Sequence, residues 1–473
     1  MHPMIPLLGL ALVVVPCLSV SNSSDSLWCQ LCSCTNNGSV VDCRQAGLGS
    51  LPLPDWSNPT NFTIVIFDNN TISHVSAFPE RRLNASVISF RNNAITSIEN
   101  AAFKYVGGLK EIDLSYNHLS SDKFTGDIFK GSYVGGMYQP LADMEILRLS
   151  GNGLHTLDPN LFEHLPYLRV LTLDSNPFGV IDHGTLIALA NIPKLEYLDL
   201  TNTKLREIPQ YMLHTSMNLL VLNISYNNLE DIPSEIGYAH KLQHLVLDGN
   251  PIEEIHKSPL VPTLRRLDLS SMPKLARIFS RSLGNFTQLR ELVMVNNTNL
   301  YKIDKDALVY VESAEPEIKV WPQIKKLNIS DNRLAWLDPS FIGDWGKLDE
   351  VGIGRNPWVC DCENNWFLSE LMPRIAQLHP EEASRLVCHD PVEMRGRSIL
   401  ELSQNHADMR CLDYYGNQPE NDGTVILFTC IATLVVVLII AGTLAYLRRE
   451  TWNFAGGRCS YRRAGSLEAI YHH

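Results

Sequence analysis

An eleven-residue pattern, L-x-x-L-x-L-x-x-N-x-L, recurs along most of the 473-residue chain and restricts the folds open to it. Other apolar residues often replace leucine, and most successive starts lie 22 to 27 residues apart. No single repeat can bury its apolar side alone, so the repeats must stack around one continuous core. The sequence therefore predicts an α/β repeat solenoid in which each repeat supplies one short strand. The pattern starts at Phe62, Ala85, Leu109, Met144, Leu168, Leu195, Leu219, Leu242, Leu264, Leu289, Ile324 and Leu348.

The asparagine at the ninth position has a structural explanation. The chain turns away from the strand there, which places backbone donors and acceptors inside the turn. An amide side chain pairs with both kinds of group, so we expect a buried ladder of stacked asparagines. Thr203 interrupts the ladder but keeps a hydroxyl, whereas Met272 offers none, and we expect a local irregularity at Met272. The ladder consists of Asn70, Asn93, Asn117, Asn152, Asn176, Asn227, Asn250, Asn297, Asn332 and Asn356.

Two repeats are longer than the others. The starts at Leu109 and Met144 are 35 residues apart, and so are the starts at Leu289 and Ile324. The first insert is rich in glycine and serine, and the second is acidic and contains two prolines. Long connections are often functional or mobile, but tolerated surface insertions explain them equally well.

Segments outside the repeats predict the compartment. Residues 1–21 are apolar and end in small residues, which is typical of a cleaved signal peptide. Residues 424–447 carry no charge and are long enough to cross a bilayer as a helix. They follow a linker, 413–423, and precede a basic tail, 448–473. The positive-inside rule therefore predicts a single-pass type I protein of the plasma membrane with an extracellular N-terminus.

Eight of the eleven cysteines form two groups at opposite ends of the predicted extracellular part. An even number in each group predicts disulfides in a secreted chain. A zinc site in the first group is disfavoured, because secretion leads to an oxidising compartment and no second CxxC accompanies the first. Spacing alone permits three connectivities in each group. The two groups are Cys29, Cys32, Cys34 and Cys43, and Cys360, Cys362, Cys388 and Cys411.

Over residues 29–411 the chain resembles the extracellular leucine-rich-repeat family. The spacing C-x2-C-x-C-x8-C from Cys29 is similar to the N-terminal cap of that family, and NPWVCDCENNWFLSEL is similar to its C-terminal cap. The resemblance implies a horseshoe of about twelve repeats over 61–358, between caps at 29–60 and 359–412. It also implies four disulfides, which are Cys29–Cys34, Cys32–Cys43, Cys360–Cys388 and Cys362–Cys411.

The family includes Toll-type innate receptors, adhesion proteins such as connectin and chaoptin, axon-guidance receptors and matrix proteoglycans. Toll-type receptors carry a cytoplasmic signalling domain much longer than the 26-residue tail of this chain. The resemblance therefore implies a cell-surface adhesion protein or co-receptor that binds an extracellular protein. An innate-immune recognition receptor that signals through an associated chain and a matrix-anchoring structural protein are the alternatives.

Strand positions three and five flank the buried fourth residue and are expected to point outward on the concave side. Position five supplies the candidate partner-binding residues Asp113, Arg148, Thr172 and Asp199. Several acids in the middle repeats suggest a stripe that steers a basic partner, although a solvated face explains them as well. This stripe consists of Asp113, Asp174, Asp199, Asp248 and Asp268, and an apolar group at the N-terminal end consists of Ile64, Ile66 and Val87.

N-x-[ST] sequons limit the open part of this face. Sugars on Asn223 and Asn328, both at position five, would prevent a large protein from lying flat along the whole sheet, leaving mainly the stretch from Leu109 to about Leu200. The predicted glycosylation sites are Asn37, Asn61, Asn69, Asn84, Asn223, Asn285, Asn296 and Asn328, and Asn22 also fits the motif.

Other activities have little support in the sequence. Nucleophile, zinc-protease and phosphate-binding motifs are missing, so we expect no enzyme, no cofactor and no metal site. The formal net charge of −12 argues against nucleic-acid binding. Ala441 and Ala445 would permit close approach of two membrane helices, which makes a homodimer possible.

Overall fold

The computed structural model describes residues 28–35, 39–51, 60–80, 83–314, 317–411 and 422–455. The predicted signal peptide, most of the predicted linker, the tail beyond residue 455 and the sequons at Asn22 and Asn37 lie outside these residues. The chain divides into two compact units, Met1–Asn356 and Pro357–His473. Each unit is described separately.

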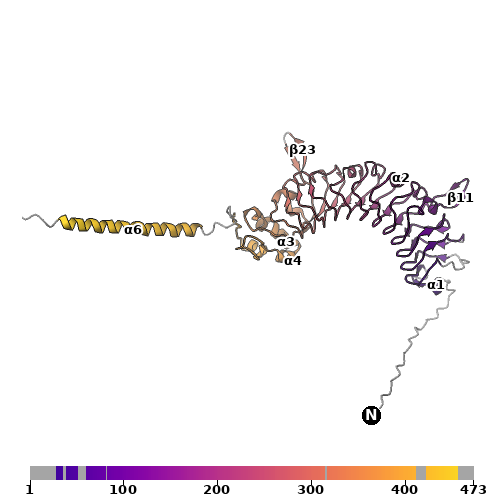
Figure 1. Cartoon of the computed structure of the whole chain (residues 1–473), viewed down its shortest axis with the longest axis horizontal. Helices are drawn as coiled ribbons and strands as arrows, with labels where there is room; N and C mark the ends of the chain where they lie inside the picture. The colour runs from indigo at the N-terminus through magenta and orange to yellow at the C-terminus, as the bar shows by residue number, and fades with distance from the viewer. Residues whose placement is uncertain are drawn as a thin grey trace, which may run out of the picture. The chain divides into compact units, whose positions relative to one another are not determined.

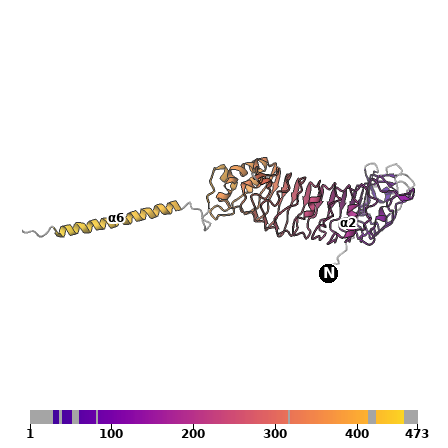
Figure 2. The ribbon, with the colours of Figure 1, turned by 90° about the horizontal axis from the view of Figure 1, so that it is seen from above.

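The first unit is a solenoid whose turns each contribute one strand to a 14-stranded sheet. Figure 1 shows this unit as an arc of stacked turns with the long sheet along its inner side, and Figure 2 shows the turns from above. Every neighbouring pair in the sheet is parallel except β1 and β2. The strands are β1 (Ser33–Thr35), β2 (Val40–Asp42), β4 (Ile64–Ile66), β7 (Val87–Ser89), β10 (Glu111–Asp113), β13 (Ile146–Arg148), β14 (Val170–Thr172), β15 (Tyr197–Asp199), β16 (Val221–Asn223), β17 (His244–Val246), β19 (Arg266–Asp268), β21 (Glu291–Val293), β25 (Lys326–Asn328) and β26 (Glu350–Gly352).

Short elements make up the remainder of each turn. They form small parallel sheets, single helical turns and one longer helix, α2 (His183–Ala190), which begins after Asp182 accepts a hydrogen bond from the Thr185 amide. The strands are β3 (Thr60–Asn61), β6 (Leu83–Asn84) and β9 (Val106–Gly107), then β5 (His74–Val75) and β8 (Ser97–Ile98), then β18 (Glu254–Ile255), β20 (Arg277–Ile278) and β22 (Lys302–Ile303). The short helices are α1 (Trp28–Leu31), η1 (Gly126–Phe129), η2 (Ser234–Tyr238), η3 (Pro339–Ile342) and η4 (Trp345–Lys347).

The core consists of stacked apolar residues from equivalent places in successive turns. Positions four and six of the pattern are buried throughout; Leu171 and Leu173, for example, are fully buried. Near the N-terminal end phenylalanine replaces leucine at position six, and the rings of Phe67 and Phe90 stack with centroids 5.1 Å apart. Because each residue packs on its equivalents above and below, the core is continuous along the unit, as a solenoid requires.

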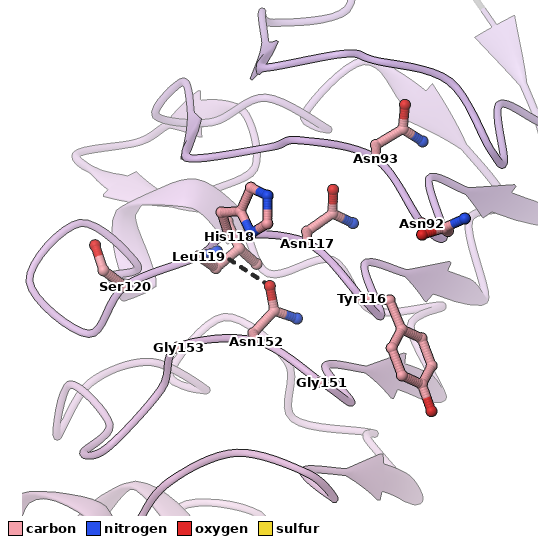
Figure 3. Close-up of a pocket in the computed structure, with 10 residues that line it drawn as sticks. All are labelled: Asn92, Asn93, Tyr116, Asn117, His118, Leu119, Ser120, Gly151, Asn152 and Gly153. Carbon is pink, nitrogen blue, oxygen red and sulfur yellow. Dashed lines mark hydrogen bonds between the residues drawn. The ribbon is translucent and has the colours of Figure 1, made fainter.

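The asparagine ladder forms as predicted. Asn117 donates from Nδ2 to the carbonyls of Phe90 (2.9 Å) and Leu114 (3.0 Å), and its Oδ1 accepts from the Ile95 amide (3.0 Å). Asn152 repeats the arrangement one turn later and accepts from the Leu119 amide at 3.1 Å, as Figure 3 shows. Each asparagine thus joins its own turn to the preceding one.

The two interruptions of the ladder leave the sheet intact. Thr203 donates from Oγ1 to the Leu200 carbonyl at 2.7 Å, so its hydroxyl replaces one amide bond. The prediction of a local irregularity at Met272 is wrong for the sheet, because β17, β19 and β21 pair in uninterrupted parallel register. The Met272 amide donates to Oδ1 of Asn297 at 2.8 Å, and the methionine side chain is fully buried. Asn297, the ladder residue of the following turn, therefore still bonds to the turn of Met272, although Met272 itself has no amide side chain to bond in return.

The residue before each ladder position adopts positive φ, which tightens the turn out of the strand. At two places a tyrosine takes this position and a glycine takes it in the next turn. A Cβ at Gly151 would lie 2.6 Å from the Tyr116 ring, and Gly249 is in the same relation to Tyr226. Glycine is therefore needed at both sites for the rings to lie against the following turn.

Each insert folds as a β-hairpin. The first forms β11 (Tyr133–Val134) and β12 (Met137–Tyr138), and the second forms β23 (Tyr310–Ala314) and β24 (Glu317–Val320). Figure 1 shows both hairpins projecting from the outer side of the arc. The sequence located both inserts but did not predict their hairpin structure.

Disulfides Cys29–Cys34 and Cys32–Cys43 close the N-terminal end of the first unit. In the second unit Cys360 pairs with Cys388 and Cys362 with Cys411, so all eight cysteines are joined in the pairs that the resemblance implied. The helices of this unit are η5 (Cys362–Asn364), the π-helical η6 (Phe367–Leu371), α3 (Met372–Leu378), α4 (Pro380–Arg385), α5 (Ile399–Gln404) and α6 (Asp422–Ala455). The segment Val425–Arg449 of α6 is long and apolar enough to cross a membrane and includes most of the predicted span.

Candidate protein-binding surface

The long parallel sheet arranges its outward side chains in rows that run across the strands. Parallel register aligns the third position of each repeat with the third position of the next, and the fifth with the fifth. From β10 to β16 the third-position row is Glu111, Ile146, Val170, Tyr197 and Val221. The fifth-position row is Asp113, Arg148, Thr172, Asp199 and Asn223.

The predicted partner-binding residues form one continuous row, but most already have partners within the solenoid. Arg148 donates from Nε to Glu111 at 2.7 Å. Asp113 accepts from the Ser115 amide at 2.8 Å. Thr172 is only 6% exposed and its hydroxyl lies 3.0 Å from that of Ser150, so it offers little surface to a partner.

Asp199 has three hydrogen-bond donors around it. It accepts hydrogen bonds from the Tyr197 hydroxyl (3.1 Å), the Thr201 amide (2.9 Å) and Nδ2 of Asn223 (3.3 Å). Burial, together with the neighbouring Asp199 carboxylate, raises the pKa of Tyr197 to about 12. The phenol is therefore neutral at physiological pH, and its hydroxyl donates a hydrogen bond that holds Asp199 in place.

The expected acidic stripe is interrupted. Asp268 is 4% exposed and bonds to Nε2 of His244 at 2.5 Å and to Nε of Arg266 at 2.9 Å. Burial works to raise the pKa of Asp268, but these hydrogen bonds lower it overall. Burial raises the pKa values of Asp174 and Asp248, which are partly enclosed at the strand ends. These acids are therefore engaged in local hydrogen bonds or partly enclosed, and they do not form one continuous exposed stripe.

The sequence reasoning missed an apolar row at the third position. Ile146, Val170, Tyr197 and Val221 occupy four adjacent strands, β13 to β16, and all four are partly exposed. The signal was available, because position three alternates outward just as position five does. The same alternation places Ile64 and Val87 outward at the N-terminal end, and it extends to these four strands.

An ion-pair ladder borders this apolar row at the second position. Glu145 lies between Lys110 (3.7 Å) and Arg169 (3.6 Å), and Arg169 also reaches Glu196 at 2.8 Å. Exposed pairs of this kind contribute little stability, typically about 0–1 kcal/mol each. Their effect is that the charges along this border largely neutralise one another.

Beyond β16 the third-position row becomes charged. It continues as His244, Arg266, Glu291, Lys326 and Glu350, with ion pairs between Arg266 and Glu291 (3.4 Å) and between Lys326 and Glu350 (2.8 Å). The inner face therefore has an apolar middle stretch and a charged C-terminal stretch. The apolar stretch overlaps the region that the sequons were expected to leave open.

The concave sequons lie at the end of the apolar stretch and beyond it. Asn223 and Asn328 are partly exposed, and each Oδ1 accepts from the amide of the sequon serine at 3.1 Å, Ser225 or Ser330. Among the other predicted sites, Asn69, Asn84 and Asn296 are exposed and Asn285 is partly exposed. Asn61 lies in β3, and occupancy at all of these positions stays a prediction.

A shallow hollow of about 620 Å³ lies beside the ladder at the turn that precedes the first insert. In Figure 3 its lining is mostly ladder asparagines and backbone, with Tyr116 at one side and His118 and Ser120 toward the other. Its asparagines Asn93, Asn117 and Asn152 are already bonded within the ladder. In the described part of the chain, no three His, Cys, Asp or Glu side chains gather to hold a metal ion.

Comparisons with known proteins agree with this architecture. A family model described as a leucine-rich repeat region matches residues 151–343. Mouse CD180 antigen is 26% identical over 343 residues, which cover 70% of this chain and 48% of that protein. Trophoblast glycoprotein of Macaca fascicularis is 26% identical over 284 residues, covering 58% of this chain and 54% of its own. The chain thus spans about half the length of these curated relatives.

Among solved structures, Toll in the Drosophila Toll–Spatzle complex superposes with a TM-score of 0.50 at 21% identity, covering 75% of this chain and 46% of that one. This likeness concerns the fold. The repeat match and the capped parallel-sheet solenoid show a leucine-rich repeat region, and the sequence relatives support kinship with extracellular leucine-rich-repeat proteins of the Toll-ectodomain and adhesion kind.

Proposed function

We propose that this chain is a cell-surface recognition protein, an adhesion protein or co-receptor, that binds an extracellular protein through the middle of its inner face. The observation that carries the proposal is the row of Ile146, Val170, Tyr197 and Val221, four partly exposed apolar side chains on adjacent strands. We call these four residues the apolar row.

The chemistry of the row favours a protein partner. Removing apolar surface from water stabilises a complex by about 25 cal/mol per Å², so the row contributes roughly 1 kcal/mol per side chain if each loses about 40 Å². Tyr197 is the expected hot spot, because tyrosine is enriched where interface energy concentrates. The internally neutralised border at Glu145 and Arg169 adds specificity by disfavouring a partner with an unpaired charge there.

The same proposal assigns the membrane anchor. A segment of suitable length and composition in α6, which ends in the basic residues Arg448 and Arg449, supports a type I arrangement at the plasma membrane. The Toll–Spatzle structure is described as a hub in development and innate immunity. By analogy, we propose that the ligand of this chain is also a protein.

A binding screen tests the function. The soluble ectodomain is presented to a panel of secreted and surface proteins, and each ligand found is measured again with Tyr197→Ala and with Tyr211→Ala. Tyr211 is a matched control, because it is 61% exposed and lies in the connection between β15 and β16. We expect Tyr197→Ala to weaken binding by tenfold or more, as hot-spot loss costs about 2 kcal/mol, and Tyr211→Ala to leave it unchanged. Equal effects of the two variants would contradict the proposal.

Cell aggregation on expression separates the two roles. Aggregation of expressing cells would assign the adhesion role, and binding without aggregation would assign the co-receptor role.

A further inference from the structure

The first insert presents the strongest exposed apolar feature on the solenoid outside the sheet. In the hairpin β11–β12 the exposed fractions are 64% for Tyr133, 58% for Val134, 68% for Met137 and 45% for Tyr138. Tyr133 pairs with Tyr138 across the hairpin and Val134 pairs with Met137, so the two pairs occupy opposite faces. Both faces of this hairpin therefore carry exposed apolar side chains, and Tyr138 also contacts the His164 ring at 6.3 Å between centroids.

The hairpin is firmly built. Its turn is Gly135–Gly136, both at positive φ, which suits the tight two-residue turn of a right-twisted hairpin. Below the tyrosines the Gln139 amide donates to the Ser132 carbonyl at 2.9 Å, and the Gly131 amide donates to the Gln139 carbonyl at 2.9 Å.

The tyrosine rings add to this rigidity. The Tyr133 and Tyr138 rings pack edge to face with centroids 5.0 Å apart. Lys130 lies 4.7 Å from the centre of the Tyr138 ring. The exposed apolar side chains of the hairpin are thus held in a fixed arrangement, so binding another surface costs little side-chain entropy.

The second insert shows what a hairpin tied to its own solenoid looks like. In β23–β24 Glu317 pairs with Arg281, and Lys319 pairs with Asp306 at 3.0 Å. These contacts hold the hairpin to the preceding turns. The first hairpin carries no charged residue between Gly131 and Ala142, so ion pairs of this kind cannot form along it.

We propose that the β11–β12 hairpin is a self-association site, where one copy of this chain meets the same hairpin of a second copy. Charge supports this occupant: the chain has a net charge of −12, so two copies repel each other over most surfaces, whereas this segment is uncharged. Symmetry supports it as well, since an antiparallel hairpin edge is self-complementary about a twofold axis. The outward backbone groups of Tyr133 supply one such edge, on β11, and those of Tyr138 supply the other, on β12.

The size of the patch sets the strength of the contact. Taking about 150–250 Å² for a large side chain, the four residues expose roughly 450 Å² per copy. The two pairs lie on opposite faces, so one contact covers about half of this area, and two copies would bury roughly 450 Å² in total, far below the usual 1,200–2,000 Å² of a stable interface. We therefore expect a weak dimer that forms when copies are concentrated on one membrane rather than in dilute solution.

A charge-swap experiment on the full-length chain tests the proposal. Two differently tagged copies are co-expressed, and co-capture is measured after equal surface amounts are verified. Val134→Glu with Met137→Glu on both copies, or Val134→Lys with Met137→Lys on both, should reduce co-capture at least fivefold. Pairing one Glu copy with one Lys copy should restore it to within twofold of wild type. Val180→Glu, at a valine that is 62% exposed outside the hairpin, should have no effect.

A cross-link provides a second readout that does not depend on weakening the contact. Val134→Cys on the full-length chain should give a covalent dimer on non-reducing gels, and Ile318→Cys in the other hairpin should not. The proposal is overturned if wild-type copies do not co-capture, if the Glu variants co-capture normally, or if the mixed Glu and Lys pair fails to recover. Equal cross-linking at the two cysteines would overturn it as well.

Discussion

Removing one ladder asparagine tests the physical basis of the fold. Asn176 is 1% exposed and bonds to two turns at once. Its Oδ1 accepts from the amides of Asn152 (3.1 Å) and Leu154 (3.2 Å), and its Nδ2 donates to the carbonyls of Leu149 and Leu173, both at 2.9 Å. Asn176→Ala therefore leaves two buried N–H groups without an acceptor and deprives two carbonyls of a donor.

These bonds give the size of the effect. Each buried N–H group left unpaired costs about 1–3 kcal/mol, so the two amides alone cost about 4 kcal/mol. A carbonyl has a second lone pair, so its loss adds less. Asn176→Thr should be only slightly less destabilising than Asn176→Ala, because the natural Thr203 shows that a hydroxyl at this position donates to the strand carbonyl at 2.7 Å, which restores the carbonyl contact and not the two amide contacts.

The assay is thermal and denaturant unfolding of the soluble ectodomain. Asn228→Ala is the control, since Asn228 is exposed one residue after a ladder position. We expect the order of stability to be control, then Asn176→Thr, then Asn176→Ala, with hydrogen exchange rising first in the turns around Asn152 and Asn176. If Asn176→Ala unfolds like the control, the ladder does not stabilise the solenoid and the reasoning fails.

Three further predictions concern sugars, protons and disulfides. Asn223→Gln and Asn328→Gln should each lower the mass of the secreted chain by one glycan, and unchanged masses would remove the proposed sugar boundary. Because burial raises the pKa values of Asp68, Asp174 and Asp248 in the folded chain, these three groups should contribute stability that grows as the pH falls through their folded pKa values toward the unfolded value. This contribution is complete below the unfolded pKa and is lost as the pH rises through the folded pKa. Asp174→Asn should flatten the measured dependence of Tm on pH, and an unchanged slope would contradict this cause. Cys360→Ser with Cys388→Ser should destabilise the second unit by about 2–4 kcal/mol in denaturant unfolding, and an unchanged midpoint would contradict it.

The solenoid could be predicted because its cause is local and repeated. Each repeat carries its strand, its buried leucines and its ladder asparagine within eleven residues, so one pattern determined the parallel sheet. The consequences of Met272 could not be predicted in the same way. Whether the sheet tolerates the missing amide depends on Asn297, which lies a turn away and bonds back to the Met272 amide.

The candidate site was harder to predict than the fold, because exposure depends on neighbouring turns. Thr172 has the same place in its repeat as Asp199, yet it is buried between adjacent strands and bonds to Ser150. Arg148 was predicted to bind a partner, but Glu111, on the neighbouring strand, already accepts a hydrogen bond from it. The predicted binding residues came from position five, where the side chains are mostly polar, whereas the apolar row lies at position three. The hairpins depend on strand pairing within each insert, which spacing alone did not show.

Photo-cross-linking tests the central claim, that the apolar row is the binding surface, most directly. A photoreactive amino acid replaces Val170, in the middle of the row, or Val180, which is 62% exposed in the connection that follows the same strand. Each variant of the full-length chain is displayed on cells and exposed to the ligand found by the binding screen. The account predicts a covalent adduct from position 170 and none from position 180. An adduct from position 180 alone would show that the partner binds elsewhere and would contradict the account.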